Sequence, residues 1–354
     1  MNHRKVKRNF IIESDLEFII SQPVNWQKLQ GKTILITGAN GLLLSYMVET
    51  ILYLNDHVFS DATTVIALVR NQEKADERFK DYLERKDLQF VYQDVSLPLI
   101  LDHLEIDFII HGASLASPKY YNTNPVDVLL PNVLGTQELL KLAFVKNINS
   151  FLFFSSSEVY GELDDSKIPT SENDFGYIDP TNIRACYAES KRMGETLCVS
   201  WFKQYNIPTK IVRPFHTYGP KMQLDDGRVF ADFVSNIIKK EDIILKSNGL
   251  AKRAFCYLAD ATVAFFMVLL EGENGQAYNV GNKDAETSMK DLALLLVNCF
   301  PDYNLKVKTI IRHDEYMPSN VSRNCPNIDK IEKLGWTPKF SLKEGFINTI
   351  NSFL

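Results

Sequence analysis

The sequence predicts an α/β fold built on a doubly wound parallel sheet, followed by a smaller C-terminal lobe. Short β-rich runs alternate with helical stretches, and several runs are almost wholly apolar, as strands buried on both faces are. After Pro214 the pattern changes to loops and shorter elements rich in Asp, Arg and Lys, which is typical of a substrate-covering lobe. The predicted strands are residues 33–37, 64–70, 88–93, 108–111, 150–155 and 209–213.

Three parts are predicted along the chain. Residues 1–30 form an extension with a short helix and a connector that carries Trp26, and its first eight residues, MNHRKVKR, are basic and expected to be a mobile arm. Residues 31–215, with about 252–282, form the main domain, and the span 277–280 is expected to return a strand to its sheet. The smaller lobe comprises residues 216–251 and 283–354.

Composition limits the possible classes of function. The 354 residues have a net charge of −5 and an ordinary apolar content, which indicates a globular protein without a basic field for nucleic acid. No run approaches about 18 uninterrupted apolar residues, and the start lacks a signal-peptide core, so we expect a cytoplasmic protein without a membrane partner. The five cysteines form no C-x-x-C pair, which favours reduced thiols and predicts no metal site.

A predicted phosphate-binding turn follows the first strand. The run ILITGANGLLL at 34–44 reads as a buried strand, a glycine turn and a helix start, so Gly38 and Gly41 let the backbone approach a pyrophosphate at the helix N-terminus. We expect a dinucleotide cofactor on Gly38, Asn40, Gly41 and Leu42 in a Rossmann-type sheet. A third glycine is expected where Leu44 stands, and its absence should alter helix-to-strand packing more than phosphate contact.

The end of the second strand bears on the choice of dinucleotide. Arg70 stands where a carboxylate usually binds the ribose 2′-hydroxyl of NAD. A guanidinium there can hold a 2′-phosphate or stack on adenine. NAD is the expected cofactor, and Arg70 leaves NADP open.

Tyr187 and Lys191 form a predicted catalytic couple. They are four residues apart, so on a helix they share one face. A nearby ammonium and a positive nicotinamide favour the phenolate, which would make Tyr187 a base near neutral pH, and Lys191 can also hold the ribose hydroxyls. The run FLFFSSSEVYG at 151–161 is a buried strand that opens into hydroxyls and one carboxylate, where open α/β sheets place ligands.

These residues resemble the extended short-chain dehydrogenase/reductases that modify nucleotide sugars, and the resemblance covers residue 32 to the C-terminus. Within that group the sequence is most similar to the UDP-glucuronate decarboxylases, also called UDP-xylose synthases. The stretches that carry the resemblance are ASLASPKYY at 113–121, SSEVYG at 156–161, RACYAESKR at 184–192, DGRV at 226–229 and KRAF at 252–255.

The resemblance implies roles for individual residues. Tyr187 would take the proton of the sugar C4 hydroxyl while hydride leaves C4 for the nicotinamide, and Ser156 would share that hydrogen bond. Ser157 and Glu158 match the serine and the catalytic glutamate of the decarboxylases, and Arg253 completes the implied catalytic set. Oxidation at C4 would give a β-keto acid that loses carbon dioxide, after which the stored hydride returns to C4.

Other site residues also follow from the resemblance. Asp94 would bind the adenine amino group, with Val95 and Ala113 beside the cofactor. His216 stands where decarboxylases usually have an asparagine near the nicotinamide or the sugar. The implied substrate-binding residues are Tyr121, Arg184, His216, Arg228 and Arg253. Helices around 126–146 and 186–205 correspond to those that form a homodimer interface in relatives.

Several reactions remain open at this point. A 4,6-dehydratase normally carries Asp-Glu where Ser157 and Glu158 stand, because it must protonate a leaving hydroxyl. A 4-epimerase needs only the Tyr187/Lys191 couple, and a 4-keto reductase would use NADPH. A non-catalytic nucleotide-sugar sensor is disfavoured, since Ser156, Tyr187 and Lys191 are all retained.

Overall fold

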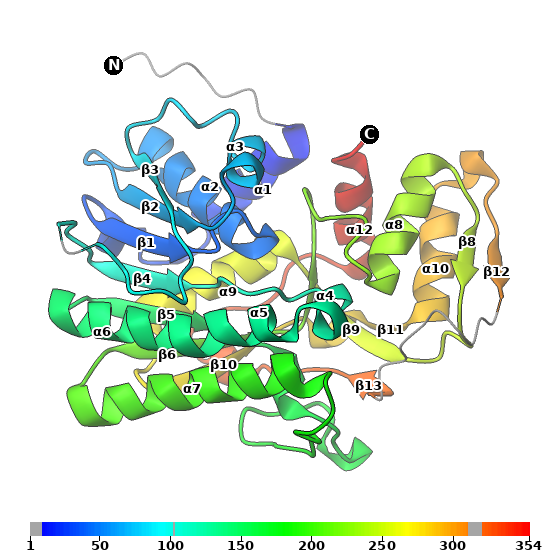
Figure 1. Cartoon of the computed structure of the whole chain (residues 1–354). Coiled ribbons are helices and arrows are strands. Elements are labelled where there is room, and N and C mark those ends of the chain that lie inside the picture. The colour runs from blue at the N-terminus through cyan, green and yellow to red at the C-terminus, as the bar shows by residue number, and fades with distance from the viewer. Residues whose placement is uncertain (1–8, 102, 311–320) are drawn as a thin grey trace.

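The computed structural model describes residues 9–101, 103–310 and 321–354. Within these residues a seven-stranded parallel sheet lies at the centre, in the order β10-β6-β5-β4-β1-β2-β3 (Figure 1). The six predicted strands are confirmed to within one residue, and the returning strand is present as β10. The bounds are β1 (Thr33–Thr37), β2 (Thr64–Val69), β3 (Leu88–Tyr92), β4 (Phe108–His111), β5 (Ser150–Phe154), β6 (Thr209–Pro214) and β10 (Gln276–Val280).

Helices cover both faces of this sheet, which confirms the doubly wound Rossmann architecture (Figure 1). Successive strand residues point to opposite faces, so Ile34 and Ile36 join one core and Leu35 joins the other. The first core packs against α1 (Phe10–Ser21), α2 (Leu42–His57), α3 (Gln72–Arg78) and α9 (Leu258–Glu271). The second packs against α6 (Thr136–Lys146) and α7 (Ala185–Tyr205), with α5 (Pro125–Leu130) and the π-turn η2 (Pro131–Gly135) leading into α6.

The stretch Pro125–Lys146 is the one helix in the described ranges that is long and apolar enough to cross a membrane. Half of it is buried inside the protein. That burial is typical of a core helix on the face of a sheet.

The N-terminal extension packs into the main core. Its helix α1 lies against α2 and α9, and the connector forms the short turn η1 (Trp26–Leu29). The Trp26 ring meets Phe266 of α9 edge-on at 5.1 Å between centroids, and its Nε1 donates to Ile20 O at 3.1 Å. The predicted helix and Trp26 connector are confirmed, whereas the predicted mobile arm, residues 1–8, lies outside the described residues.

Asp15 on α1 is buried among tyrosines. Its carboxylate accepts hydrogen bonds from Tyr46 Oη of α2 at 2.8 Å and from Tyr257 Oη at 2.9 Å. Burial raises the pKa of Asp15 to about 7, although the two tyrosine hydrogen bonds act in the opposite direction. The extension is therefore joined to the rest of the protein by a titratable contact.

The smaller lobe continues from the carboxyl end of β6. In the described part of the chain it has a four-stranded sheet, in which β9 pairs with β7, β11 and β13, and a two-stranded sheet of β8 and β12 (Figure 1). The strands are β7 (His216–Tyr218), β8 (Ile243–Leu245), β9 (Lys252–Tyr257), β11 (Glu286–Ser288), β12 (Val307–Thr309) and β13 (Arg323–Asn324). The helices are α8 (Val229–Lys239), α10 (Met289–Cys299), α11 (Asp329–Glu332) and α12 (Leu342–Asn351).

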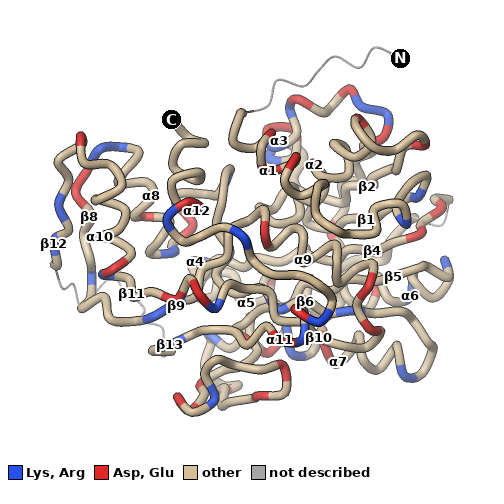
Figure 2. Tube along the Cα trace, turned by 180° about the vertical axis from the view of Figure 1, so that it is seen from behind, with Lys and Arg blue, Asp and Glu red and all other residues tan. Residues whose placement is uncertain are grey.

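The remaining short elements lie in connecting segments. They are α4 (Lys119–Thr123), η3 (Ser157–Tyr160), η4 (Asp165–Lys167), η5 (Lys283–Ala285) and η6 (Pro301–Tyr303). Acidic and basic residues are interspersed along the described trace of both lobes, in keeping with the small net charge of −5 (Figure 2).

Candidate active site

The phosphate turn connects β1 to α2 at the carboxyl edge of the sheet. Gly38 has φ = +67°, and a Cβ at this position would lie 2.6 Å from Ala113 Cα, so only glycine fits between the turn and the end of β4. Gly41 is the N-cap of α2, and no side chain caps this helix. Its first-turn amides can therefore bind an anion, and Asn40 and Leu42 flank the turn half-buried. The site fits a dinucleotide pyrophosphate.

Leu44 occupies the position expected for a third glycine. Its side chain packs on Gly112, where a Cβ would lie only 2.4 Å from Leu44 Cδ2. Close packing of α2 on the sheet is thus permitted by Gly112, which follows β4, and not by a glycine in α2. The departure from the motif therefore changes the packing of α2 on the sheet, and its small effect on phosphate contact stays a prediction.

Arg70 and Asp94 meet beyond the ends of β2 and β3. Arg70 Nη1 lies 3.7 Å from Asp94 Oδ2, and both side chains are partly exposed. Asp94 Oδ1 also accepts from the Ser96 amide at 2.9 Å. Buried Val95 follows, packed closely on Gly135. The two residues predicted for the adenosine end are therefore adjacent, and the Arg70 charge is partly matched by a carboxylate.

Tyr187 and Lys191 lie one turn apart on α7, facing the end of β5. Tyr187 is hydrogen bonded to Ser156. Lys191 Nζ lies 5.7 Å from the Tyr187 ring centroid and donates to Phe154 O at 2.6 Å. The structure thus brings together the predicted couple and the predicted serine.

Burial dominates the titration of this couple. It raises the pKa of Tyr187 to about 12, against the hydrogen bond with Ser156, while the charge of Glu158 adds to the increase. It lowers the pKa of Lys191 to about 7, against the charge of Glu195. In the protein alone, desolvation of the buried phenol raises its pKa, so the expected phenolate near neutral pH, which also requires the positive nicotinamide, stays a prediction.

The turn after β5 carries the other predicted catalytic residues. Ser156 is the N-cap of η3, and its Oγ accepts from the Glu158 amide at 3.2 Å. Ser157 is buried, whereas Glu158 is exposed. Because its charge raises the pKa of Tyr187, Glu158 lies within electrostatic reach of the couple.

Tyr121 on α4 lies beside Tyr187 at the candidate site. Its ring stacks on Tyr187 with centroids 5.4 Å apart and planes 15° apart. Its hydroxyl donates to Ala116 O at 3.1 Å, and the Arg184 guanidinium lies 6.0 Å from its ring centroid. Tyr121 and Arg184 are therefore at the site, and their contact with a substrate stays a prediction.

Two arginines of the smaller lobe lie within electrostatic reach of His216, and one of them, Arg228, is also within reach of Tyr187. Arg228 Nη2 pairs with Asp226 at 2.6 Å, and buried Arg253 donates to Val321 O at 2.8 Å. His216 Nδ1 is buried and has no hydrogen-bond partner among the described residues. Burial, with the charges of Arg253 and Arg228, lowers the pKa of His216 to about 3, so the ring is neutral.

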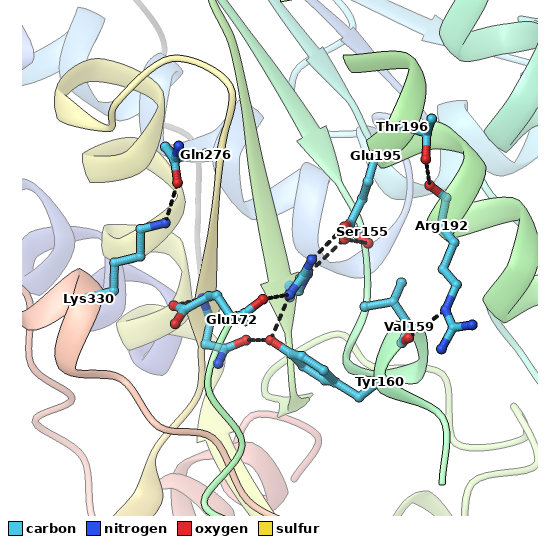
Figure 3. A network of polar contacts seen from close by, with 11 residues as sticks. Ser155, Val159, Tyr160, Glu172, Arg192, Glu195, Thr196, Gln276 and Lys330 are labelled. Atoms are coloured by element: carbon cyan, nitrogen blue, oxygen red, sulfur yellow. Dashed lines mark hydrogen bonds and ion pairs between the residues drawn. The ribbon is translucent and has the colours of Figure 1, made fainter. Parts of the chain in front are cut away.

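A buried polar network that was not predicted from the sequence lies one helical turn beyond Lys191 and includes Glu195 and Ser155 (Figure 3). Glu195 of α7 pairs with Arg213 of β6 through Nη2 and Oε2 at 2.6 Å and through Nε and Oε1 at 2.8 Å, and it accepts from Ser155 Oγ at 2.5 Å. Glu195 lies four residues after Lys191, which continues the spacing that identified the couple. This spacing of four residues is the sequence signal that indicates Glu195 on the same helix face.

A second missed contact holds the turn. Arg192 Nε donates to Val159 O of η3 at 2.8 Å (Figure 3), and its Nη2 donates to Gly176 O at 3.0 Å. The turn with Ser156 and Glu158 is thereby attached to α7 on its outer side. This guanidinium follows Lys191 directly in the sequence.

All five cysteines are free thiols, as predicted. Cys186, beside Tyr187, is only partly buried. Among the described residues no group of three or more His, Cys, Asp or Glu side chains is placed to hold a metal ion.

Comparison with known proteins places the chain in a family. The model of the NAD dependent epimerase/dehydratase family matches residues 34–281. UDP-glucuronic acid decarboxylase 6 of Arabidopsis thaliana is 34% identical over 315 residues, covering 88% of this chain and 86% of that protein. UDP-glucuronic acid decarboxylase 1 of Danio rerio is 31% identical over 330 residues, covering 91% and 72%.

Solved structures share the fold. UDP-glucose 4-epimerase of Thermotoga maritima superposes with a TM-score of 0.77 at 22% identity, covering 91% of this chain and 98% of that one. UDP-glucuronic acid 4-epimerase of Bacillus cereus, in complex with UDP-glucuronic acid and NAD, gives 0.76 at 22% identity, covering 90% and 98%. The matched residues 34–281 include the phosphate turn, the Tyr187/Lys191 couple and Arg253. Because the match covers most of the sequence, this chain belongs to the NAD dependent epimerase/dehydratase family.

Proposed function

We propose that this chain oxidises C4 of a nucleotide-activated sugar with bound NAD, and that it decarboxylates UDP-glucuronate to a UDP-pentose. The observation that carries the proposal is the meeting of Tyr187, Ser156 and Lys191 at the carboxyl end of β5. The identity of about one third with UDP-glucuronic acid decarboxylases over most of the chain supports this substrate.

The residues that would bind NAD lie at the ends of β1, β2 and β3 and on α7. Gly38, Gly41 and the free amides of α2 would hold the pyrophosphate, Arg70 and Asp94 the adenosine, and Lys191 the nicotinamide ribose. When bound, the cofactor supplies a hydride acceptor and a positive charge beside Tyr187. Because Arg70 is already paired with Asp94, a 2′-phosphate would have to compete with a carboxylate, which favours NAD over NADP. Mass spectrometry of the cofactor extracted from purified protein tests this choice.

Tyr187 acts first as the base for the sugar C4 hydroxyl. Its pKa, raised to about 12 by burial, must fall for this role at neutral pH, and the charges of Lys191 and of the nicotinamide favour the phenolate. Ser156 shares the hydrogen bond to the same hydroxyl and so orients it toward Tyr187.

Loss of carbon dioxide then follows from the chemistry of the substrate. A ketone at C4 is β to the C6 carboxylate, so the C5–C6 bond breaks with its electron pair delocalised into the C4 oxygen. The enolate would take a proton at C5, and a bound cofactor would supply the hydride that restores C4, so that the cofactor is unchanged over one turnover. Glu158 lies within reach of this centre, and Arg253, Arg228 and His216 form the side that would hold the sugar carboxylate or the diphosphate.

A 4-epimerase is the second candidate, because the couple and Ser156 suffice for C4 oxidation and reduction. An epimerase would leave Glu158 without a role, so the placement of this carboxylate within electrostatic reach of Tyr187 favours the decarboxylase. A 4,6-dehydratase is less well supported, because Ser157, in place of an aspartic acid, is buried and cannot protonate a leaving hydroxyl. A 4-keto reductase would require NADPH, and a non-catalytic sensor would bind without turnover.

One incubation separates these reactions. Purified protein is mixed with UDP-glucuronate, and the products are analysed for carbon dioxide and a UDP-pentose, with Tyr187→Phe as the inactive control. A six-carbon UDP-uronate isomer would instead identify a 4-epimerase. A 4-keto-6-deoxy sugar from dTDP-glucose would identify a dehydratase, and a thermal shift without product would identify a sensor.

We also propose that the protein is a cytoplasmic homodimer that associates through α5, α6 and α7. These helices, with the turn η2 between α5 and α6, expose several large apolar side chains, as surfaces that bind another protein often do. They are Val126, Leu130, Leu134, Phe144, Val145, Met193, Val199 and Tyr205. Light scattering of the parent should give twice the mass of the chain, and Val145→Glu should give the monomer.

A further inference from the structure

The sheet-facing side of α7 carries three side chains at successive helical turns, and each meets the end of β5. Tyr187 is hydrogen bonded to Ser156, Lys191 donates to Phe154 O, and Glu195 accepts from Ser155 Oγ. All three contacts therefore join α7 to residues 154–156. The third contact has no role in the reaction as described.

Of the three side chains, Glu195 also forms a two-point ion pair with an arginine. Arg213 binds both carboxylate oxygens, at 2.6 and 2.8 Å, and the pair is almost wholly buried. Arg213 Nη1 also donates to Tyr160 Oη at 3.0 Å, at the end of η3 (Figure 3). The pair therefore touches the segment that carries Ser156 and Glu158 at both ends, through Ser155 and Tyr160.

We propose that Glu195 and Arg213 are positioning residues, which hold residues 155–160 against α7 so that Ser156 and Tyr187 share one substrate hydroxyl. This inference rests on the proposed function. A buried ion pair is weak evidence of stabilisation, since an apolar pair of the same volume is often as stable. What the pair supplies is a directional contact to the residue before Ser156, and a misplacement of about 1 Å there can cost about 10²-fold in rate.

Glu195 also acts on the charge of Lys191. The charged or titratable groups that face Lys191 are Tyr187, Glu195 and Cys198 from α7, His111 from β4 and, across Glu195, Arg213 from β6. Glu195 raises the pKa of Lys191, against burial, whereas burial lowers the pKa of His111 to about 3 and leaves it neutral. Loss of the Glu195 charge would therefore deprotonate Lys191 at a lower pH.

Two variants of the full chain with its bound cofactor test the inference. Glu195→Gln should lower kcat about 10- to 100-fold, with KM within about two-fold, and should move the alkaline limb of the kcat profile to lower pH by about one unit. Ser155→Ala leaves the ion pair intact and should lower kcat by about three- to ten-fold, so it remains informative if the first variant fails to fold. Glu332→Gln, which removes a half-exposed carboxylate of α11 that pairs with Lys283, away from this segment, is the control and should equal the parent.

The inference is overturned if both variants fold and keep the parent kcat and pH profile, or if kcat falls only in proportion to the folded fraction. A parent that makes no pentose from UDP-glucuronate overturns the proposed function instead. A readout without substrate then remains, namely the tyrosinate difference spectrum between each protein and its Tyr187→Phe form. Its midpoint should move to higher pH in Glu195→Gln, because the Ser156 hydrogen bond lowers the pKa of Tyr187, and an unchanged midpoint would contradict the positioning role.

Discussion

Leu44 and Gly112 are sterically complementary: the Leu44 side chain lies where a Cβ at residue 112 would stand, at 2.4 Å. One residue is in the first turn of α2 and the other follows β4. The pair sets how closely α2 approaches the sheet, and hence where the amides that face the cofactor lie.

Gly112→Ala should therefore destabilise the protein by about 1–3 kcal/mol through overpacking. The double variant Gly112→Ala with Leu44→Ala should recover part of this loss, because the smaller side chain at 44 leaves room for the new methyl group. Urea unfolding of the parent, both single variants and the double variant gives the coupling energy. Additive effects would show that the two residues are independent.

Tyr187→Phe should lower kcat by about 10²–10⁴-fold, because the proton of the C4 hydroxyl then has no base. Binding of the nucleotide sugar should change little, since the ring that stacks on Tyr121 is retained. Turnover is measured with the assay described above, and Tyr120→Phe, a half-buried neighbour, is the control. Retention of more than a few per cent of the parent rate would contradict the role of Tyr187.

Asp15 should make the stability of the protein depend on pH. Burial raises its pKa to about 7 in the folded state from 3.8, so the folded state binds the additional proton between these values. The free energy of unfolding should therefore fall as pH rises from about 4 to about 7, by up to about 4 kcal/mol. Asp15→Asn should flatten this slope in urea unfolding at pH 4, 5.5 and 7. An equal slope in parent and variant would assign the dependence to other groups.

His216 should not titrate in the range where the enzyme is assayed. Burial holds its pKa at about 3, so the profile of kcat/KM between pH 5 and 8 should be the same in His216→Asn as in the parent. An inflection near pH 6.5 that disappears in the variant would contradict a neutral ring.

His216→Ala should raise KM by about five-fold if the unpaired Nδ1 bonds the substrate, whereas His216→Asn should keep most of the affinity.

Local patterns predicted most of the fold and the meeting of Tyr187, Lys191 and Ser156. The strands were evident because fully buried runs such as 151–154 have no polar residue, and the couple was evident because Tyr187 and Lys191 are close in sequence. The Glu195–Arg213 pair was missed because its partners lie 18 residues apart on different elements. The burial that raises the pKa of Tyr187 in the protein alone could not be predicted, because it depends on the whole packed structure. Gly112 was missed because its partner, Leu44, lies on another element.

The helix α7 carries residues of the candidate active site and also residues of the proposed homodimer surface. Tyr187, Lys191 and Glu195 look toward the sheet, while Met193, Val199 and Tyr205 are exposed on the same helix. A second subunit seated on the outer side would press the proton-transfer groups inward against β5. Dilution below the dissociation constant of the dimer would then reduce the rate per chain before any chain unfolds, so the specific activity would report on subunit association.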